Sequence, residues 1–212
     1  MNRIAVFASG RGSNFQTIVH RIEDGYLPAR VAVLVSDRPT AGAIAFAEGR
    51  DIPVAVVRPA DFASPEQFGA ALLAVLAPHD CRLLVLAGYL KKIPDPVVAA
   101  YANRIVNIHP ALLPAFGGRG MYGMSVHRAV WASGARGSGV TVHLVNTVYD
   151  AGPIVLQVPV DIADCDGPES VAERVLAHEH DAFPRALKAL LDSDYRVEGN
   201  RVLFGRSIHD PH

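Results

Sequence analysis

Short apolar runs alternate along the first half of the chain with segments whose apolar residues recur at helical spacing. The apolar runs are four or five residues long and rich in Val, Ile and Leu, as in strands that are buried on both faces. They lie at residues 4–8, 31–35, 54–57, 83–87 and 105–108. The helical segments between them lie at about residues 15–22, 41–49, 64–76 and 96–102. This alternation predicts a parallel sheet with right-handed crossovers.

The pattern changes after Gly139. Apolar residues alternate with other residue types from residue 140 to residue 145, and residues 154–162 form a second β-run, which together predict antiparallel strands. A long helix is expected from about residue 169 to residue 191, with a kink at Pro184. A hairpin follows at residues 196–204, turning at residues 198–200. The predicted fold class is therefore α/β: a Rossmann-like, mostly parallel sheet flanked by helices, with antiparallel strands toward the C-terminus.

Length and composition narrow the class of protein. The chain has 212 residues, which predicts one domain over residues 1–212. Half of the residues are hydrophobic and 19% are charged, which suffices for a sizeable core. The net charge of −1 and the lack of a long basic run argue against a nucleic-acid binder. No apolar stretch approaches the roughly 20 residues that span a bilayer, and the first apolar run is too short for a signal peptide, so we expect a cytoplasmic protein.

The two cysteines, Cys81 and Cys165, lie far apart and form no CxxC motif. They cannot build a structural zinc site by themselves, and we interpret both as ordinary residues.

The first candidate site is the loop A-S-G-R-G-S-N, residues 8–14, between a predicted strand and a predicted helix. Glycines allow a tight turn, and the N–H groups around Gly12, Ser13 and Asn14 would face an anion at the helix N-terminus. The loop lacks the Gly-Lys-Ser/Thr signature of a P-loop, and Phe15 occupies the third glycine position of a dinucleotide fingerprint. It favours a single phosphate; the alternative is a helix capped by Ser13 or Asn14.

The second candidate site is Asn107 and His109, in the segment N-I-H-P. Side chains two residues apart on a strand point to the same face, so both should meet at the carboxyl end of this strand. Ligands bind at that edge of an open α/β sheet. The amide can donate to an oxyanion, and the imidazole can donate or accept near neutral pH. The alternative is a polar pair that caps the strand end.

Asp150, in the turn Y-D-A-G-P, is the third candidate. An aspartate there is commonly turn chemistry, but next to His109 its charge would raise the pKa of the imidazole. Other polar residues are weaker candidates. His143 lies in an alternating strand, where an imidazole is more often packed or capped than functional. Lys91 and Lys92 are most simply a solvated pair at a strand end, although they lie at the sheet edge where they could meet an anionic ligand. His178-Glu179-His180 cannot chelate jointly, since residues two apart point about 200° from each other on a helix.

Together these residues resemble glycinamide ribonucleotide formyltransferase, the folate-dependent phosphoribosylglycinamide formyltransferase of purine biosynthesis. The matching motifs, in order, are SGRGSN, VLAGYL, NIHPALLP, GVTVHLV, DAGPIVLQ and HEHDAFP, which span residues 9–184. The Asn-x-His and Asp set is shared with other formyltetrahydrofolate enzymes, and the SGxGSN opening singles out this family.

The resemblance implies the formyltransferase fold and direct transfer of a formyl group from 10-formyltetrahydrofolate, the co-substrate, to the amine of glycinamide ribonucleotide. It implies that Asn107 and protonated His109 stabilise the oxyanion and that Asp150 keeps His109 protonated and helps to move the amine's proton. The implied binding residues are Gly12, Ser13 and Asn14 for the phosphate, Glu179 for the ribose hydroxyls, and Leu90, Lys91, Lys92 and Ile93, with the loop 144–150 and Asn107, for the folate. No metal is required.

In this interpretation, residues 1–110 form the nucleotide-binding half and residues 111–212 the folate-binding and C-terminal half, in a monomer or homodimer. The chain departs from many members in two places. The segment A-F-G-G-R-G-M-Y-G-M-S-V-H-R is several residues longer than usual, so no loop histidine is carried over to His127. Pro65 stands where some members have an arginine directed toward the folate.

Three rival interpretations remain open. Methionyl-tRNA formyltransferase would need a longer chain with a C-terminal nucleic-acid-binding domain, and formyltetrahydrofolate deformylase an extra N-terminal regulatory domain. A non-catalytic nucleotide-binding module, with Asp37 as a ribose ligand, would leave the Asn107, His109 and Asp150 set without a role.

Overall fold

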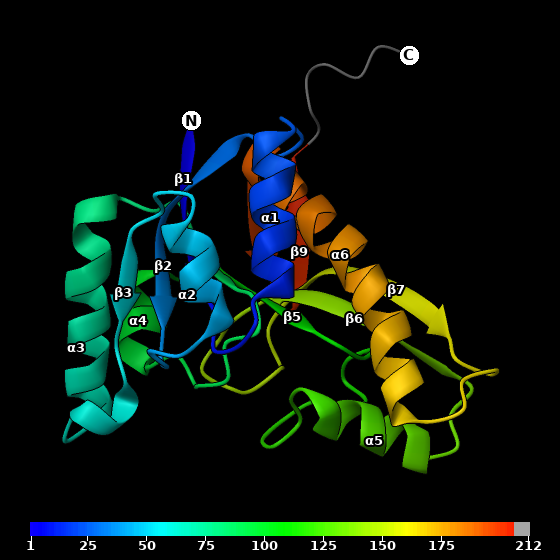
Figure 1. Ribbon diagram of the computed structural model, residues 1–212. Coiled ribbons are helices and arrows are strands. Elements are labelled where there is room, and N and C mark those ends of the chain that lie inside the picture. Colours follow the sequence, from blue (N-terminus) through cyan, green and yellow to red (C-terminus); the bar gives the residue numbers. More distant parts are fainter. Residues whose placement is uncertain (206–212) are drawn as a thin grey trace.

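The computed structural model describes residues 1–205 and contains a nine-stranded sheet with helices on both faces (Figure 1). The strands are β1 (Asn2–Phe7), β2 (Ala29–Ser36), β3 (Val54–Val56), β4 (Leu83–Leu86), β5 (Ile105–His109), β6 (Gly137–Leu144), β7 (Ile154–Asp161), β8 (Tyr195–Glu198) and β9 (Arg201–Phe204). The α-helices are α1 (Ser13–Glu23), α2 (Gly42–Glu48), α3 (Pro65–Leu76), α4 (Asp95–Ala100), α5 (Met124–Ala132) and α6 (Pro168–Asp192). Short 3-10 helices occupy Pro59–Asp61 and Ala77–His79.

The strand order is β3-β2-β1-β4-β5-β6-β7-β9-β8. Strands β1 to β5 pair in parallel, whereas β6 runs antiparallel to both β5 and β7. The last two strands form an antiparallel hairpin, and β9 joins the sheet in parallel to β7. The predicted α/β class, the antiparallel C-terminal strands and the hairpin are confirmed.

Each parallel strand contributes side chains to two hydrophobic cores, one on each face of the sheet. In β1, Ile4 and Val6 belong to one core and Ala5 and Phe7 to the other, because successive side chains point to opposite faces. Helices α1, α2, α5 and α6 contribute to the first core, and α3 and α4 to the second. Figure 1 shows α1 and α6 together over one face and α3 with α4 over the other. Burial on both faces explains why these strands lack polar alternation.

Helices α5 and α6 differ from what the sequence pattern predicts. Helix α5 was not predicted, because the glycine-rich segment before it is typical of a loop; the helix is held by Val126 and Val130, both fully buried in the first core. Helix α6 stays helical on both sides of Pro184, and the kink remains a prediction. The Leu113-Pro114 bond is cis.

The carboxyl ends of β4 and β5 and the amino-terminal loop meet at one edge of the sheet. Strand pairing places Leu86 beside Asn107, and the antiparallel β6 places His143 on the other side of Asn107. The Ser9 hydroxyl accepts a hydrogen bond from the Leu90 N–H (2.9 Å), which ties the first loop to the segment after β4. None of the helices within residues 1–205 combines the length and apolar character needed to cross a membrane.

Candidate active site

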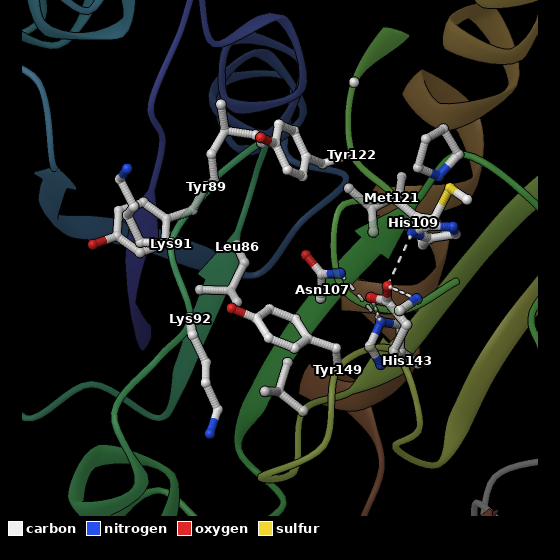
Figure 2. Close-up of a pocket in the computed structure, with 18 of the residues that line it drawn as sticks. Leu86, Tyr89, Lys91, Lys92, Asn107, His109, Met121, Tyr122, His143 and Tyr149 are labelled. Carbon is white, nitrogen blue, oxygen red and sulfur yellow. Dashed lines mark hydrogen bonds and ion pairs between the residues drawn. The ribbon is translucent and has the colours of Figure 1, made fainter. Parts of the chain in front are cut away.

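A cavity of about 480 Å³ opens at this edge of the sheet (Figure 2). Four segments of the chain form most of its walls: residues 86–93, the end of β5, the loop 118–123, and the end of β6 with the loop 145–150. Helices α1, α5 and α6 contribute one residue each. Of the site residues expected from the sequence, those that line it are Asn14, Leu90, Lys91, Lys92, Ile93, Asn107, His109, Asp150 and Glu179. Gly12 and Ser13 do not line the cavity but immediately precede Asn14.

Asn107 and His109 share one face of β5, as the strand spacing predicts, and both line the cavity. The Asn107 amide contacts Nε2 of His143 at 3.1 Å, while Nδ1 of His143 lies 2.9 Å from the Leu144 carbonyl oxygen. A carbonyl can only accept, so Nδ1 carries the hydrogen and Nε2 accepts from the Asn107 amide. The amide of Asn107 keeps a second hydrogen that it can donate to a ligand.

Both ring nitrogens of His109 face hydrogen-bond acceptors. Nε2 lies 2.9 Å from the Phe116 carbonyl oxygen, and Nδ1 lies 3.7 Å from Oδ2 of Asp150. Two acceptors favour the doubly protonated imidazolium. The ring is only 3% exposed, however, and burial lowers the pKa of His109 below 6.5 although Asp150 and the Phe116 carbonyl raise it. The expected effect of Asp150 is present, but burial outweighs it.

Asp150 bridges two imidazoles. Its Oδ1 lies 3.6 Å from Nε2 of His143, and its Oδ2 accepts a hydrogen bond of 2.8 Å from the Gly118 N–H as well as facing His109. Burial raises the pKa of Asp150, but the hydrogen bond from the Gly118 N–H and the charge of a protonated His109 outweigh it and hold the pKa below 3.8. Asp150 is therefore ionised at neutral pH.

The loop that faces Asp150 is closely packed at Gly117. A Cβ atom on Gly117 would lie 2.5 Å from Cδ2 of Leu113 and 3.2 Å from Cβ of Asp150. No larger residue fits that approach without moving its neighbours. Gly117 thus lets the Gly118 N–H reach the carboxylate.

His143 is the residue of this cluster that the sequence analysis ranked too low. It is 2% exposed and packed, as expected for an imidazole inside a strand, but it also lines the cavity and contacts Asn107 and Asp150. The alternation of residues in β6 predicts which face of the sheet His143 occupies, but not which residue of the neighbouring strand it contacts. Only the register of β6 against β5 places it opposite Asn107.

Asn14 of α1 and Glu179 of α6 meet in the wall of the cavity. The Asn14 amide donates to Oε2 of Glu179 at 2.6 Å, and both side chains are buried. Burial raises the pKa of Glu179 to about 7, against the lowering effect of this hydrogen bond. Oδ1 of Asn14 is buried and has no hydrogen-bond partner within the described residues. The two side chains thus offer one acceptor and one titratable carboxyl to a polar ligand.

The start of α1 has no side-chain cap. Its N-cap is Gly12, which adopts the left-handed conformation with φ of 75°, and neither Ser13 nor Asn14 serves as the capping side chain. The alternative in which one of these residues caps the helix is therefore wrong. The uncapped N–H groups of the first turn are the usual donors of an anion site.

The two lysines at the rim are partly neutralised. Nζ of Lys91 lies 3.9 Å from Asp37, and Nζ of Lys92 lies 3.0 Å from Asp95. Asp37 is buried and is not among the residues that line the cavity. The structure therefore gives no support to Asp37 as a ribose ligand at this site.

His127, on α5, also lines the cavity, although nothing in the sequence marks it as a site residue. It is 6% exposed, and burial, with a smaller effect of His109, lowers its pKa below 6.5. Within residues 1–205, no three His, Cys, Asp or Glu side chains are grouped so that they would hold a metal ion.

Comparison with known proteins gives a consistent result. A family model described as formyl transferase matches residues 2–187. The chain is 44% identical to the chloroplastic phosphoribosylglycinamide formyltransferase of Arabidopsis thaliana, covering 99% of this chain and 72% of that protein. It is 38% identical to the phosphoribosylglycinamide formyltransferase of Bacillus subtilis, covering 93% of this chain and 99% of that protein. The crystal structure of glycinamide ribonucleotide transformylase 1 from Symbiobacterium toebii is similar with a TM-score of 0.90 and 37% identity, over 96% of this chain and 94% of that one.

Proposed function

Since the chain belongs to the formyl transferase family and, within it, to the phosphoribosylglycinamide formyltransferases, we propose that it transfers the formyl group of 10-formyltetrahydrofolate to the amine of glycinamide ribonucleotide. The products are formylglycinamide ribonucleotide and tetrahydrofolate, in purine biosynthesis. The observation that carries the proposal is the convergence of Asn107, His109 and Asp150 in one cavity that also holds Asn14 and Glu179. The first three supply the chemistry, and the last two give the polar wall that the ribose of a ribonucleotide needs.

The ribonucleotide binds at the start of α1. Its phosphate accepts hydrogen bonds from the backbone N–H groups around Gly12, Ser13 and Asn14, where the helix dipole favours an anion. Glu179 binds the ribose hydroxyls beside Asn14, which its buried carboxyl already contacts. This site joins the two proposed halves of the chain, because Asn14 lies in residues 1–110 and Glu179 in residues 111–212.

The folate occupies the outer part of the cavity, between the segment Leu90, Lys91, Lys92 and Ile93 and the loop that ends at Asp150. Figure 2 shows the side chains of Tyr122 and Tyr149 extending toward the wall that carries Leu86 and Tyr89. In this view, Asn107 lies between the two tyrosine rings. Apolar and aromatic side chains with a few polar groups form the lining that a flat heteroaromatic ring requires.

The reaction begins when the amine of the ribonucleotide attacks the formyl carbon. A carbon–nitrogen bond forms, and the carbonyl electrons move to oxygen. Asn107 donates its second amide hydrogen to this oxyanion, and His109 donates a ring N–H, taking the oxyanion in place of the Phe116 carbonyl. Donors that are fixed before the charge appears are each worth about 3 kcal/mol of barrier.

The tetrahedral intermediate then releases tetrahydrofolate. The former amine loses a proton, the bond from carbon to the folate nitrogen breaks, and that nitrogen takes up a proton. Asp150 stabilises the imidazolium of His109 and receives the amine's proton, consistent with its position between His109 and His143. No covalent intermediate with the protein is needed.

The proposal is tested with purified protein, 10-formyltetrahydrofolate and glycinamide ribonucleotide, following release of tetrahydrofolate. We expect turnover that requires the ribonucleotide. Equal turnover without it would identify a hydrolase built on the same site. No turnover with or without the ribonucleotide would refute the transferase.

A further inference from the structure

Three lysine and arginine side chains line the cavity: Lys91, Lys92 and Arg119. Both lysines have carboxylate neighbours, at 3.9 Å and 3.0 Å. Arg119 has neither a hydrogen bond nor an ion pair with any residue in the described range 1–205. It is exposed, so its guanidinium is hydrated and free to bind an anion at the mouth of the cavity.

The backbone holds Arg119 next to the catalytic cluster. The preceding residue, Gly118, donates its N–H to Asp150 at 2.8 Å. Gly118 and Gly120, on either side of Arg119, have φ of 100° and 88°, a conformation that other residues rarely adopt. The loop is therefore anchored at one point and shaped by its glycines. This geometry keeps Arg119 at the rim rather than in the surrounding solvent.

The two proposed co-substrates offer different anions to this arginine. The ribonucleotide phosphate already has the start of α1, which lacks a side-chain cap and immediately precedes the cavity residue Asn14. The glutamate tail of the folate carries carboxylates and leaves the cavity on the solvent side. Its carboxylates need a cation at the rim, and Arg119 is the rim cation that no described carboxylate neutralises. We infer that Arg119 binds the glutamate carboxylate of the folate, an inference that rests on the proposed function.

The test pairs two ligands with four proteins. Folic acid and pteroic acid share the pterin and the aminobenzoate, but pteroic acid lacks the glutamate. Their dissociation constants are measured by calorimetry for the unchanged protein, Arg119→Ala, Arg119→Lys and the control Arg128→Ala. Arg128 is an exposed arginine of α5 that does not line the cavity.

We expect Arg119→Ala to bind folic acid about three- to tenfold more weakly, as for a partly solvated charge-assisted contact, and pteroic acid unchanged. Arg119→Lys should recover part of the loss, since it keeps the charge but not the bidentate geometry. The loss should shrink at high salt, because the contact is exposed to screening. Arg128→Ala should behave as the unchanged protein.

Three results would overturn the inference. Equal losses for folic and pteroic acid would mean that Arg119 shapes the cavity and does not bind the tail. An unchanged affinity for folic acid, with a raised KM for the ribonucleotide, would assign Arg119 to the phosphate. If the unchanged protein bound neither ligand, the folate site would fail together with this inference. Binding needs no turnover, so an inactive but folate-binding protein would refute the proposed function and leave the inference standing.

Discussion

Replacement of Asp150 by Asn removes the negative charge between two imidazoles while keeping the size of the side chain. Asp150 lies 3.7 Å from Nδ1 of His109, and its side chain is 12% exposed. At an effective dielectric constant of about 20, the attraction at that distance is about 4.5 kcal/mol, or about three pKa units as an upper limit. Opposite charges at such distances usually shift a pKa by about one to three units.

The pKa of His109 is already lowered by burial, so the imidazolium is a minor species at pH 7. A further drop of one to three units reduces it about 10- to 1000-fold. If the imidazolium stabilises the oxyanion, kcat of Asp150→Asn at pH 7 falls by the same factor. Lowering the pH restores protonation, so kcat of the variant should rise about tenfold for each unit of pH down to the new pKa.

The assay is the steady-state rate of ribonucleotide-dependent formyl transfer between pH 5.5 and 8. Asp181→Asn is the control, because Asp181 is an exposed carboxylate paired with Arg185 on α6, outside the cavity. Thermal unfolding of both variants checks that the fold is kept. A kcat and pH profile for Asp150→Asn that match those of the unchanged protein would refute the electrostatic role of Asp150.

Three further predictions follow from the site. Gly12→Ala places a side chain at φ of 75°, with its Cβ 2.7 Å from Cβ of Ala43, so the KM for the ribonucleotide should rise and the melting temperature should fall. Gly25→Ala is the control, because it has the same kind of backbone strain (φ of 80°) with nothing near its Cβ. A similar KM in both variants would contradict the role of the Gly12 loop in phosphate binding. Glu179 has a pKa of about 7 and should release a proton when it binds the ribose, so ribonucleotide affinity should rise with pH from 5.5 to 7.5. In Glu179→Gln, only the pH dependence of affinity that comes from the phosphate of the ribonucleotide (pKa about 6) should remain. An unaltered pH dependence in calorimetry would count against ribose binding by Glu179. His143→Ala should lower kcat about tenfold or more, because the Asn107 amide loses its acceptor; a change in KM alone would show that His143 does not orient the amide.

Much of the fold could be predicted from the sequence because its signals are local. Apolar runs buried on both faces mark β1 to β5, and the change to alternation marks the antiparallel β6. Helix α5 could not be predicted in this way. Its glycine-rich approach is typical of a loop, and its stability comes from packing Val126 and Val130 into a core built by distant segments.

The candidate site shows the same division. Asn107 and His109 are two residues apart on one strand, so their convergence follows from strand geometry. His143 reaches them through the register between β5 and β6, and Asp150 through the loop after β6, and neither contact is encoded by sequence spacing. The balance that sets the pKa of His109 is also non-local. The charge of Asp150 could be anticipated, but the degree of burial, which decides the direction of the shift, could not.

The most direct test of the account follows the formyl carbon itself. The donor is prepared with ¹³C in the formyl group, the ribonucleotide with ¹⁵N in its amine, and the reaction is observed by NMR for the unchanged protein and for His109→Ala. With the unchanged protein we expect a ¹³C signal split by a one-bond coupling to ¹⁵N. With His109→Ala, formation of that product should be slower by orders of magnitude. Release of the label as free formate, or formation of the coupled product at the same rate in His109→Ala, would contradict it.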